Sequence, residues 1–218
     1  EFFLKIKNKE INGANITVPF KRDVISYLDE LSLEAEKTQS VNTVYLKDDK
    51  IIGHNTDIDG FELAMKNVDY DVEGKKVLIL GAGGVVPSVI FALYKMRPLS
   101  VTISNRTKTK AENLKNLFND LEIVDWGEAS NFDMIINATS IGLKKEDKLN
   151  LDFSKIKNKF FYDVIYNPKE TNFLKNAKNF GNKTENGKKM FIYQAAEAFR
   201  IWHGVQPEIN EEVFKILG

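Results

Sequence analysis

The 218-residue sequence predicts an α/β protein whose larger part is a doubly wound parallel sheet. The first observation is an apolar strand at residues 77–80 that runs into a glycine-rich turn at residues 81–84. A second apolar strand, at residues 101–104, begins about twenty residues after that turn. Further strand-like runs then alternate with helical patterns, which is typical of parallel strands joined by crossover helices.

Residues 1–57 show mixed signals that predict a smaller α/β unit. A short strand is expected at residues 14–18, followed by a helix with the apolar stripe Val24, Ile25, Leu28 and Leu31. Two strand-like runs, at residues 41–46 and 51–54, flank a polar stretch that predicts a hairpin turn. A connecting helix over residues 57–68 leads to the large sheet. The sequence starts at Glu1 inside an apparent element, so the chain is expected to be truncated in front.

The glycine turn predicts a dinucleotide site. Gly81 permits a tight turn, and Gly83 lets the backbone approach a pyrophosphate at the start of the next helix. Pro87 suits the first turn of that helix. A structural turn that binds nothing is the alternative from the glycines alone. A membrane helix is excluded, because the glycines and the proline leave apolar halves too short to span a bilayer.

The end of the second strand favours NADP over NAD. The residues there are Asn105, Arg106 and Thr107, where NAD-binding units usually have a carboxylate. A guanidinium pairs with a 2′-phosphate, whereas a carboxylate repels it. Thr107 is alternatively the N-cap of the next helix, whose apolar stripe is Ala111, Leu114, Leu117 and Phe118.

The second half of the chain supplies the remaining strands and two final helices. Strands are expected at residues 123–124, 134–136 and 160–164. The long helix that follows has an apolar stripe of Phe191, Ala195, Ala198, Phe199 and Trp202, and it ends at Gly204. A short helix over residues 210–217 closes the chain.

Composition narrows the function classes. The 31 basic and 31 acidic residues balance, so no net field favours nucleic acid or an anionic membrane. The chain contains no cysteine, which excludes disulfides and thiolate metal sites and suits a cytoplasmic protein. The two histidines, His54 and His203, lie far apart, and no metal site is predicted.

Polar clusters follow several strands. Lys21 is expected in the first turn of a helix, where the helix dipole opposes its charge and suits it to general acid–base chemistry. Asp57, after the hairpin, is expected to face Lys21 across a cleft or to cap the next helix. Further clusters lie at residues 137–142 and 163–168, where the carboxyl edge of a sheet meets ligands. These residues also have ordinary structural interpretations. Lys21 is alternatively a surface lysine, and Asp57 a helix cap. Gln194, which adjoins the apolar face of the last long helix, is alternatively a half-buried helix residue.

Taken together and in order, these motifs resemble the shikimate dehydrogenase family over essentially the whole chain. The family pattern Gly-x-Asn-Val-Thr-x-Pro-x-Lys appears at residues 13–21, with Ile16 in place of valine. The other matching segments are residues 41–43, 55–57, 81–84, 105–107, 137–142, 166–168 and 187–194, with Phe199 and Trp202.

The resemblance implies a Rossmann-like NADP-binding domain at residues 58–189 and a discontinuous substrate-binding domain at residues 1–57 and 190–218, completed by the C-terminal helices. It implies reversible hydride transfer between NADPH and 3-dehydroshikimate, with Lys21 and Asp57 as the catalytic pair. The implied substrate contacts are Thr17, Asn42, Asp57, Tyr166 and Gln194. The implied cofactor contacts are Gly81, Ala82, Gly83, Gly84, Val85, Asn105, Arg106, Thr107, Thr139, Val164 and Gly187.

Three departures from the family pattern are present. The family's N-terminal His-Ser-x-Ser-Pro segment, whose serines bind the substrate carboxylate, has no counterpart here, which predicts very weak or no turnover and a less stable first domain. Val85, Val86 and Pro87 crowd the glycine turn, and Lys188-Lys189 replaces smaller or apolar residues. The alternatives are a quinate/shikimate dehydrogenase, which prefers NAD in some cases, and a non-catalytic dinucleotide-binding fragment. A monomer or homodimer is expected.

Overall fold

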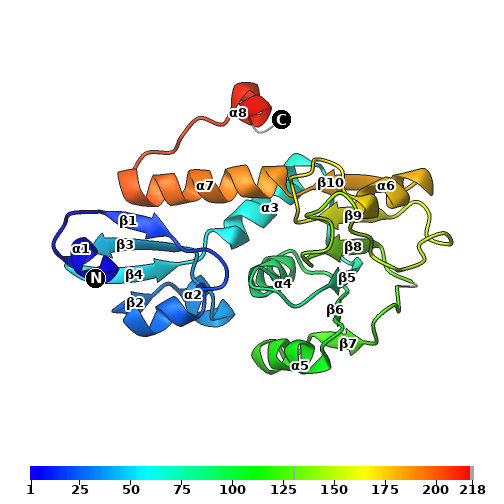
Figure 1. The fold of residues 1–218 in the computed structure, drawn as a ribbon, viewed down its shortest axis with the longest axis horizontal. Helices are drawn as coiled ribbons and strands as arrows, with labels where there is room; N and C mark the ends of the chain where they lie inside the picture. Colours follow the sequence, from blue (N-terminus) through cyan, green and yellow to red (C-terminus); the bar gives the residue numbers. More distant parts are fainter. Residues whose placement is uncertain (130, 217–218) are drawn as a thin grey trace.

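The computed structural model describes residues 1–129 and 131–216, and it contains two sheets with two helices running between them (Figure 1). The larger sheet has six parallel strands in the order β10-β9-β8-β5-β6-β7. Its strands are β5 (Lys76–Leu80), β6 (Ser100–Ser104), β7 (Glu122–Val124), β8 (Met134–Asn137), β9 (Phe160–Asp163) and β10 (Lys183–Asn186). The order reverses between β5 and β8, which confirms the doubly wound sheet and places its ligand-binding crevice there.

Alternate residues of the large sheet face two different cores. Val77 and Ile79 of β5 belong to a core shared with α3, α4 and α5, whereas Leu78 and Leu80 face α6. The helices are α3 (Asp57–Asn67), α4 (Val86–Lys95), α5 (Lys108–Leu117) and α6 (Asn172–Asn179). We call residues 76–186 the large-sheet unit. Because helices cover both faces of its sheet, the central strands are apolar at nearly every position.

The smaller sheet has four strands in the order β1-β3-β4-β2. They are β1 (Gly13–Asn15), β2 (Glu30–Leu31), β3 (Thr43–Lys47) and β4 (Lys50–His54), and two short helices, α1 (Phe2–Lys7) and α2 (Leu33–Thr38), accompany them. The β3–β4 pairing is antiparallel with Lys47 opposite Lys50, so the predicted hairpin is confirmed. One modest core, centred on Val44 and Ile51, holds this small-sheet unit (residues 1–54) together.

The helix predicted after Pro19 is wrong. Residues 18–22 form turns, and only a 3-10 helix, η1 (Asp23–Tyr27), follows before β2. The Asp29 carboxylate accepts a hydrogen bond from the Ile51 amide at 2.8 Å, and Leu31 pairs with Gly53 in a parallel ladder. These bonds draw Glu30 and Leu31 into a strand beside β4, so only Val24 and Ile25 of the predicted stripe lie in a helix, the 3-10 helix η1.

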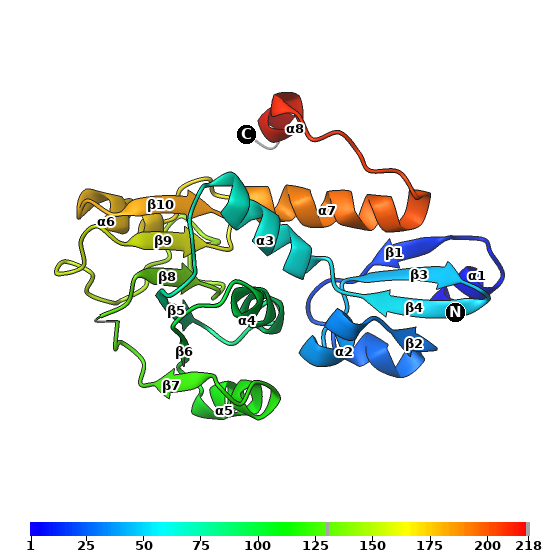
Figure 2. The same ribbon diagram turned by 180° about the vertical axis from the view of Figure 1, so that it is seen from behind.

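The C-terminal helices take different places (Figure 1; Figure 2). Helix α7 (Lys188–His203) lies along α3 and reaches β3, where the Trp202 indole donates to the Val44 carbonyl at 3.1 Å. It ends, as predicted, at Gly204, whose φ is 67°. Helix α8 (Glu211–Ile216) packs instead near the start of α7, with Phe214 beside Tyr193, and Leu217 lies outside the described residues.

The apolar stripe predicted for α7 is largely wrong. Phe191, Ala195 and Phe199 are exposed, whereas Met190 and Ala198 are buried. The reason is that the helix packs on α3 through the face that carries Met190 and Gln194, at Gly60. Among the described residues, no helix combines the length and apolarity of a bilayer span.

Candidate active site

An ion pair between Lys21 and Asp57 forms the centre of the candidate site. The Lys21 Nζ lies 2.6 Å from the Asp57 Oδ2, and both side chains are largely buried, with 13% and 9% of their surface exposed. Lys21 lies in a turn rather than in the first turn of a helix, so the expected influence of a helix dipole on it has no structural basis. Its carbonyl accepts from the Val41 amide at 2.8 Å, which fixes the turn against the start of β3.

Asn42 joins this pair to two other elements. Its Nδ2 lies 3.0 Å from the second Asp57 oxygen, 2.9 Å from Thr56 Oγ1 and 3.3 Å from Gln194 Oε1. Asp57 is the first residue of α3, and the N-cap position belongs to Thr56, so the capping alternative for Asp57 is wrong. Four segments thus come together here: the turn with Lys21, the chain just before β3 with Asn42, α3 with Asp57 and α7 with Gln194. Their donors and acceptors form a cluster that suits a hydroxylated ring.

Thr17 and Tyr166 lie apart from these hydrogen bonds. Thr17 is exposed in the loop after β1, where its carbonyl accepts from the Phe20 amide at 2.9 Å. Tyr166 follows β9 and stacks on Phe191, with ring centroids 4.5 Å apart. Because Phe191 lies one helical turn before Gln194, this stacking ties the Tyr166 loop to the same helix.

The glycine turn after β5 passes close to the loop after β8 and, in the described part of the chain, leaves several backbone amides free. Gly81 has φ +103°, and a Cβ there would lie 2.8 Å from Thr139 Cγ2 and 2.9 Å from the Ala138 carbonyl. The side chain of any other residue at position 81 would clash with the loop after β8. Within residues 1–129 and 131–216, the amides of Ala82, Gly83 and Gly84 donate to no backbone acceptor. Free amides at the start of α4, which begins beyond the N-cap Val85, fit a bound phosphate group.

The predicted 2′-phosphate residues follow β6 at the same sheet edge. Asn105 Nδ2 donates to the Thr107 carbonyl at 2.8 Å, which holds the loop closed. Arg106 is exposed and has no ion pair with any described residue. Thr107 occupies the N-cap position of α5, but its side chain makes no capping hydrogen bond. A guanidinium and a hydroxyl are therefore available to an anionic group.

Thr139, Val164 and Gly187 follow β8, β9 and β10 at this edge. The Thr139 hydroxyl donates to Asn137 at 2.8 Å, and the Gly187 amide donates to the Ile165 carbonyl at 3.1 Å. A Cβ at Gly187 would lie 2.1 Å from the Val164 carbonyl, so the two chain segments cross where only glycine fits. Burial raises the pKa of the Asp163 carboxyl to about 6, against hydrogen bonds from Thr171, Ile165 and Asn137 that lower it.

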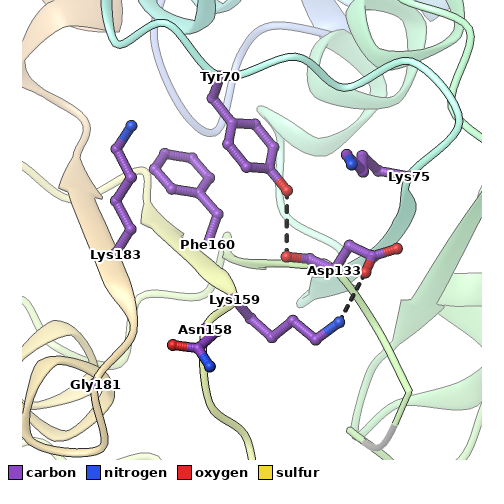
Figure 3. A pocket seen from close by; sticks show the side chains of 8 residues that line it. All are labelled: Tyr70, Lys75, Asp133, Asn158, Lys159, Phe160, Gly181 and Lys183. Carbon is purple, nitrogen blue, oxygen red and sulfur yellow. Dashed lines mark hydrogen bonds and ion pairs between the residues drawn. The ribbon is translucent and has the colours of Figure 1, made fainter.

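A hollow of about 350 Å³ lies at the opposite, amino-terminal edge of the large sheet (Figure 3). Two contacts join groups of its lining to one another: Lys159 pairs with Asp133 at 2.8 Å, and the Tyr70 hydroxyl donates to the Asp133 carbonyl at 3.2 Å. Burial raises the pKa of Tyr70 to about 12. These contacts fasten the starts of neighbouring strands, so we assign the hollow a structural role.

Comparisons with known proteins agree with this arrangement. Three family models match: the shikimate dehydrogenase substrate binding domain over residues 1–44, shikimate/quinate 5-dehydrogenase over residues 62–171, and the shikimate 5′-dehydrogenase C-terminal domain over residues 189–211. A shikimate dehydrogenase (NADP(+)) of Pelagibacter ubique is 58% identical over all of this chain, which covers 82% of that relative. This chain belongs to the shikimate dehydrogenase family.

Solved structures of shikimate dehydrogenases have the same fold. The enzyme of Aquifex aeolicus superposes with a TM-score of 0.89 at 38% identity, over 99% of this chain and 80% of that one. The enzyme of Thermus thermophilus, in complex with NADP(H) and shikimate, has a TM-score of 0.89 at 33% identity, over 100% and 83% of the two chains. The Rossmann-like α/β fold expected from the resemblance is therefore confirmed.

The sequence motifs contain one residue whose importance the motifs alone do not indicate. Asn55 is fully buried and links the loop before Asp57 to helix α4 through Ser88. Its place inside the Asn55-Thr56-Asp57 segment was the only available signal, because its partners in α2 and α4 are distant in the sequence.

Proposed function

We propose that this chain catalyses the reversible, NADP-dependent reduction of 3-dehydroshikimate to shikimate, in the shikimate pathway to aromatic amino acids. The observation that carries the proposal is the buried contact between Lys21 and Asp57, in hydrogen-bond contact with Asn42 and Gln194. A relative that shares 58% identity over the whole chain and is named a shikimate dehydrogenase (NADP(+)) supports the reaction class.

In the proposed mechanism, NADPH supplies the hydride when it is bound. The Lys21 ammonium gives the substrate oxygen its proton during reduction, and a neutral Lys21 accepts it during oxidation. Asp57 holds Lys21 in place through its 2.6 Å contact and orients the proton donor. Thr17, Asn42, Asp57 and Gln194 would bind the ring hydroxyls, and Tyr166 would line the same pocket.

The residues of the large-sheet unit fit the cofactor. The turn formed by Gly81, Ala82, Gly83, Gly84 and Val85 would hold the pyrophosphate, because its three glycines let the backbone approach that group and its free amides can donate to it. Asn105, Arg106 and Thr107 would hold the 2′-phosphate. Thr139, Val164 and Gly187 complete the cofactor contacts. Because the chain contains no cysteine, we expect the protein to act in the cytoplasm. We expect a monomer or homodimer.

Replacement of Lys21 by alanine tests the catalytic assignment. We expect Lys21→Ala to lower kcat by at least about 10²-fold, because the proton donor is lost, while the Kd for NADPH stays within about threefold of the wild-type value. NADPH oxidation with 3-dehydroshikimate measures kcat, and fluorescence titration measures the Kd for NADPH. Lys159→Ala, which removes an ion-paired lysine from the opposite sheet edge, is the matched control. Wild-type turnover in Lys21→Ala would contradict the assignment.

Quinate is the second candidate substrate, because the family model that matches residues 62–171 is named for both shikimate and quinate. A quinate dehydrogenase of Corynebacterium glutamicum, in complex with NAD, has a TM-score of 0.89 at 30% identity. The absence of a carboxylate at Asn105 and Arg106 favours NADP and hence shikimate. Oxidation of quinate with NAD at a kcat/KM equal to that of shikimate with NADP would reverse this choice.

A further inference from the structure

A buried amide links the small-sheet unit to helix α4 of the large-sheet unit. Asn55 lies between β4 and α3 and has no exposed surface. Its Nδ2 lies 3.1 Å from Thr38 Oγ1, 2.9 Å from the Ser40 carbonyl and 2.9 Å from Ser88 Oγ. Ser88, in the first turn of α4, is also fully buried. The amide therefore joins the end of α2 to the start of α4.

The carbonyl oxygen of the same side chain faces Asp57. The Asp57 amide donates to Asn55 Oδ1 at 3.2 Å, and the Ser88 hydroxyl lies at the same distance from this oxygen. One side chain thus contacts both the backbone of the ion-paired aspartate and the helix that carries the glycine turn.

Two other contacts join the units at the glycine turn itself. The Ser40 hydroxyl lies 3.4 Å from the Gly84 carbonyl, and a Cβ at Gly84 would lie 3.4 Å from Val18 Cγ2. Val18 belongs to the same loop as Lys21. The glycine turn therefore lies against the loop that presents Lys21 and against the segment that leads to Asn42.

Buried polar groups are costly unless fully bonded, and apolar side chains would fill this junction without that cost. The hydrogen bonds of Asn55 instead fix the distance between the Asp57 backbone and α4. We propose that Asn55 is a positioning residue: through Ser88 it fixes Asp57 relative to the glycine turn, so that cofactor binding and alignment of the Lys21–Asp57 pair are coupled. This inference rests on the proposed function.

Ser88→Ala is the discriminating variant, because it removes only the connection of Asn55 to α4. Asn55 keeps two acceptors for its two donor hydrogens, Thr38 Oγ1 and the Ser40 carbonyl, and its oxygen keeps the Asp57 amide. We expect kcat to fall about tenfold, within the range known for small misplacements far from the chemistry. The Kd for NADPH without substrate should change by less than about threefold, because no ligand contact is lost, whereas the KM for 3-dehydroshikimate should rise several-fold as the coupling is lost.

Thr102→Val is the matched control. It removes another buried hydroxyl, which bonds to Glu122 at 3.0 Å within the large sheet and does not reach the junction. Its kcat should equal that of the wild type, and circular dichroism should show both variants folded at the assay temperature. An equal kcat in Ser88→Ala and Thr102→Val would overturn the inference.

A binding experiment separates positioning from a merely structural role. NADPH and shikimate are both reduced and do not react, so calorimetry can measure shikimate affinity with and without NADPH. We expect NADPH to raise that affinity several-fold in the wild type and in Thr102→Val, and to leave it unchanged in Ser88→Ala. No effect of NADPH in the wild type would overturn the coupling. Failure of the proposed function has a different signature, because the wild type would then reduce no 3-dehydroshikimate.

Discussion

The two units of this protein differ in how they are held together and in what they contribute to the site. The large-sheet unit has a core on each face of its sheet, whereas the small-sheet unit has one small core with many half-exposed neighbours. The ion pair of Lys21 and Asp57 nevertheless lies on the side of the small-sheet unit. Reactive polar residues thus lie beside the unit with the smaller core, and the large-sheet unit presents the glycine turn to them.

A matched pair of core truncations should show this difference most strongly. Ile79 of β5 and Ile51 of β4 are both fully buried. We expect Ile79→Ala to lower the free energy of unfolding by about 4 kcal/mol, and Ile51→Ala by about 2 kcal/mol, both within the range for such cavities. The small core should lose less because its half-exposed neighbours can relax into the gap.

The two tryptophans allow the units to be followed separately during urea unfolding. Trp126 packs against the second core of the large sheet, and Trp202 bonds to Val44 in the small sheet. Single-tryptophan proteins, made with Trp126→Phe or Trp202→Phe, should show Ile51→Ala shifting mainly the Trp202 transition. Identical shifts of both probes would mean that the two units unfold as one.

Arg106→Ala tests the proposed contact between the large-sheet unit and the 2′-phosphate of NADP. A charge-assisted bond to a phosphate is worth about 1.5–3 kcal/mol, which corresponds to a ten- to hundredfold rise in the Kd for NADP. The Kd for NAD, which has no 2′-phosphate, should change by less than about threefold. Lys108→Ala, two residues away and exposed, is the control. An equal loss for both cofactors would contradict the 2′-phosphate assignment.

The large-sheet unit could be predicted from the sequence in more detail than the small-sheet unit. Strands β5 and β8 are continuous apolar runs, and Gly81 marks the turn after β5, so local patterns suffice. Strand β10 has the sequence Lys-Thr-Glu-Asn without an apolar residue, and it is a strand only because β9 offers it a partner. Residues 23–31 likewise take their structure from Asp29 and its bond to Ile51.

The site was predictable as a set of residues but not as a geometry. Motif order placed Lys21, Asn42, Asp57 and Gln194 in one group, and the structure brings them within hydrogen-bond distance. The face of α7 that presents Gln194 was not predictable, because it depends on the close approach of α3 at Gly60. Contacts between segments distant in the chain leave no periodic signal in either one.

Gly60→Ala tests this close approach of α3 and α7, the two helices that run between the units. A Cβ at Gly60 would lie 2.8 Å from both Gln194 Cβ and the Met190 carbonyl. We expect overpacking to lower the free energy of unfolding by about 1–3 kcal/mol, more than the gain in helix propensity. Displacement of Gln194 should also raise the KM for 3-dehydroshikimate.

Lys66→Ala, on the exposed side of α3, is the control for Gly60→Ala and should leave both quantities unchanged. Thermal unfolding and steady-state kinetics provide the two measurements. A Gly60→Ala protein with wild-type stability and KM would show that α7 can shift without disturbing the site.

The smallest expected effect concerns a buried hydroxyl in the large-sheet unit. Tyr162 is fully buried against Phe61, its hydroxyl has no hydrogen-bond partner among the described residues, and burial raises its pKa. Tyr162→Phe removes an unsatisfied group, so the free energy of unfolding should rise by up to about 1 kcal/mol. Tyr70→Phe, which loses a bond to the Asp133 carbonyl, should instead lower it by about 1 kcal/mol. Equal losses of unfolding free energy in both variants would mean that the Tyr162 hydroxyl is hydrogen-bonded, and that the core of the large-sheet unit contains a polar contact.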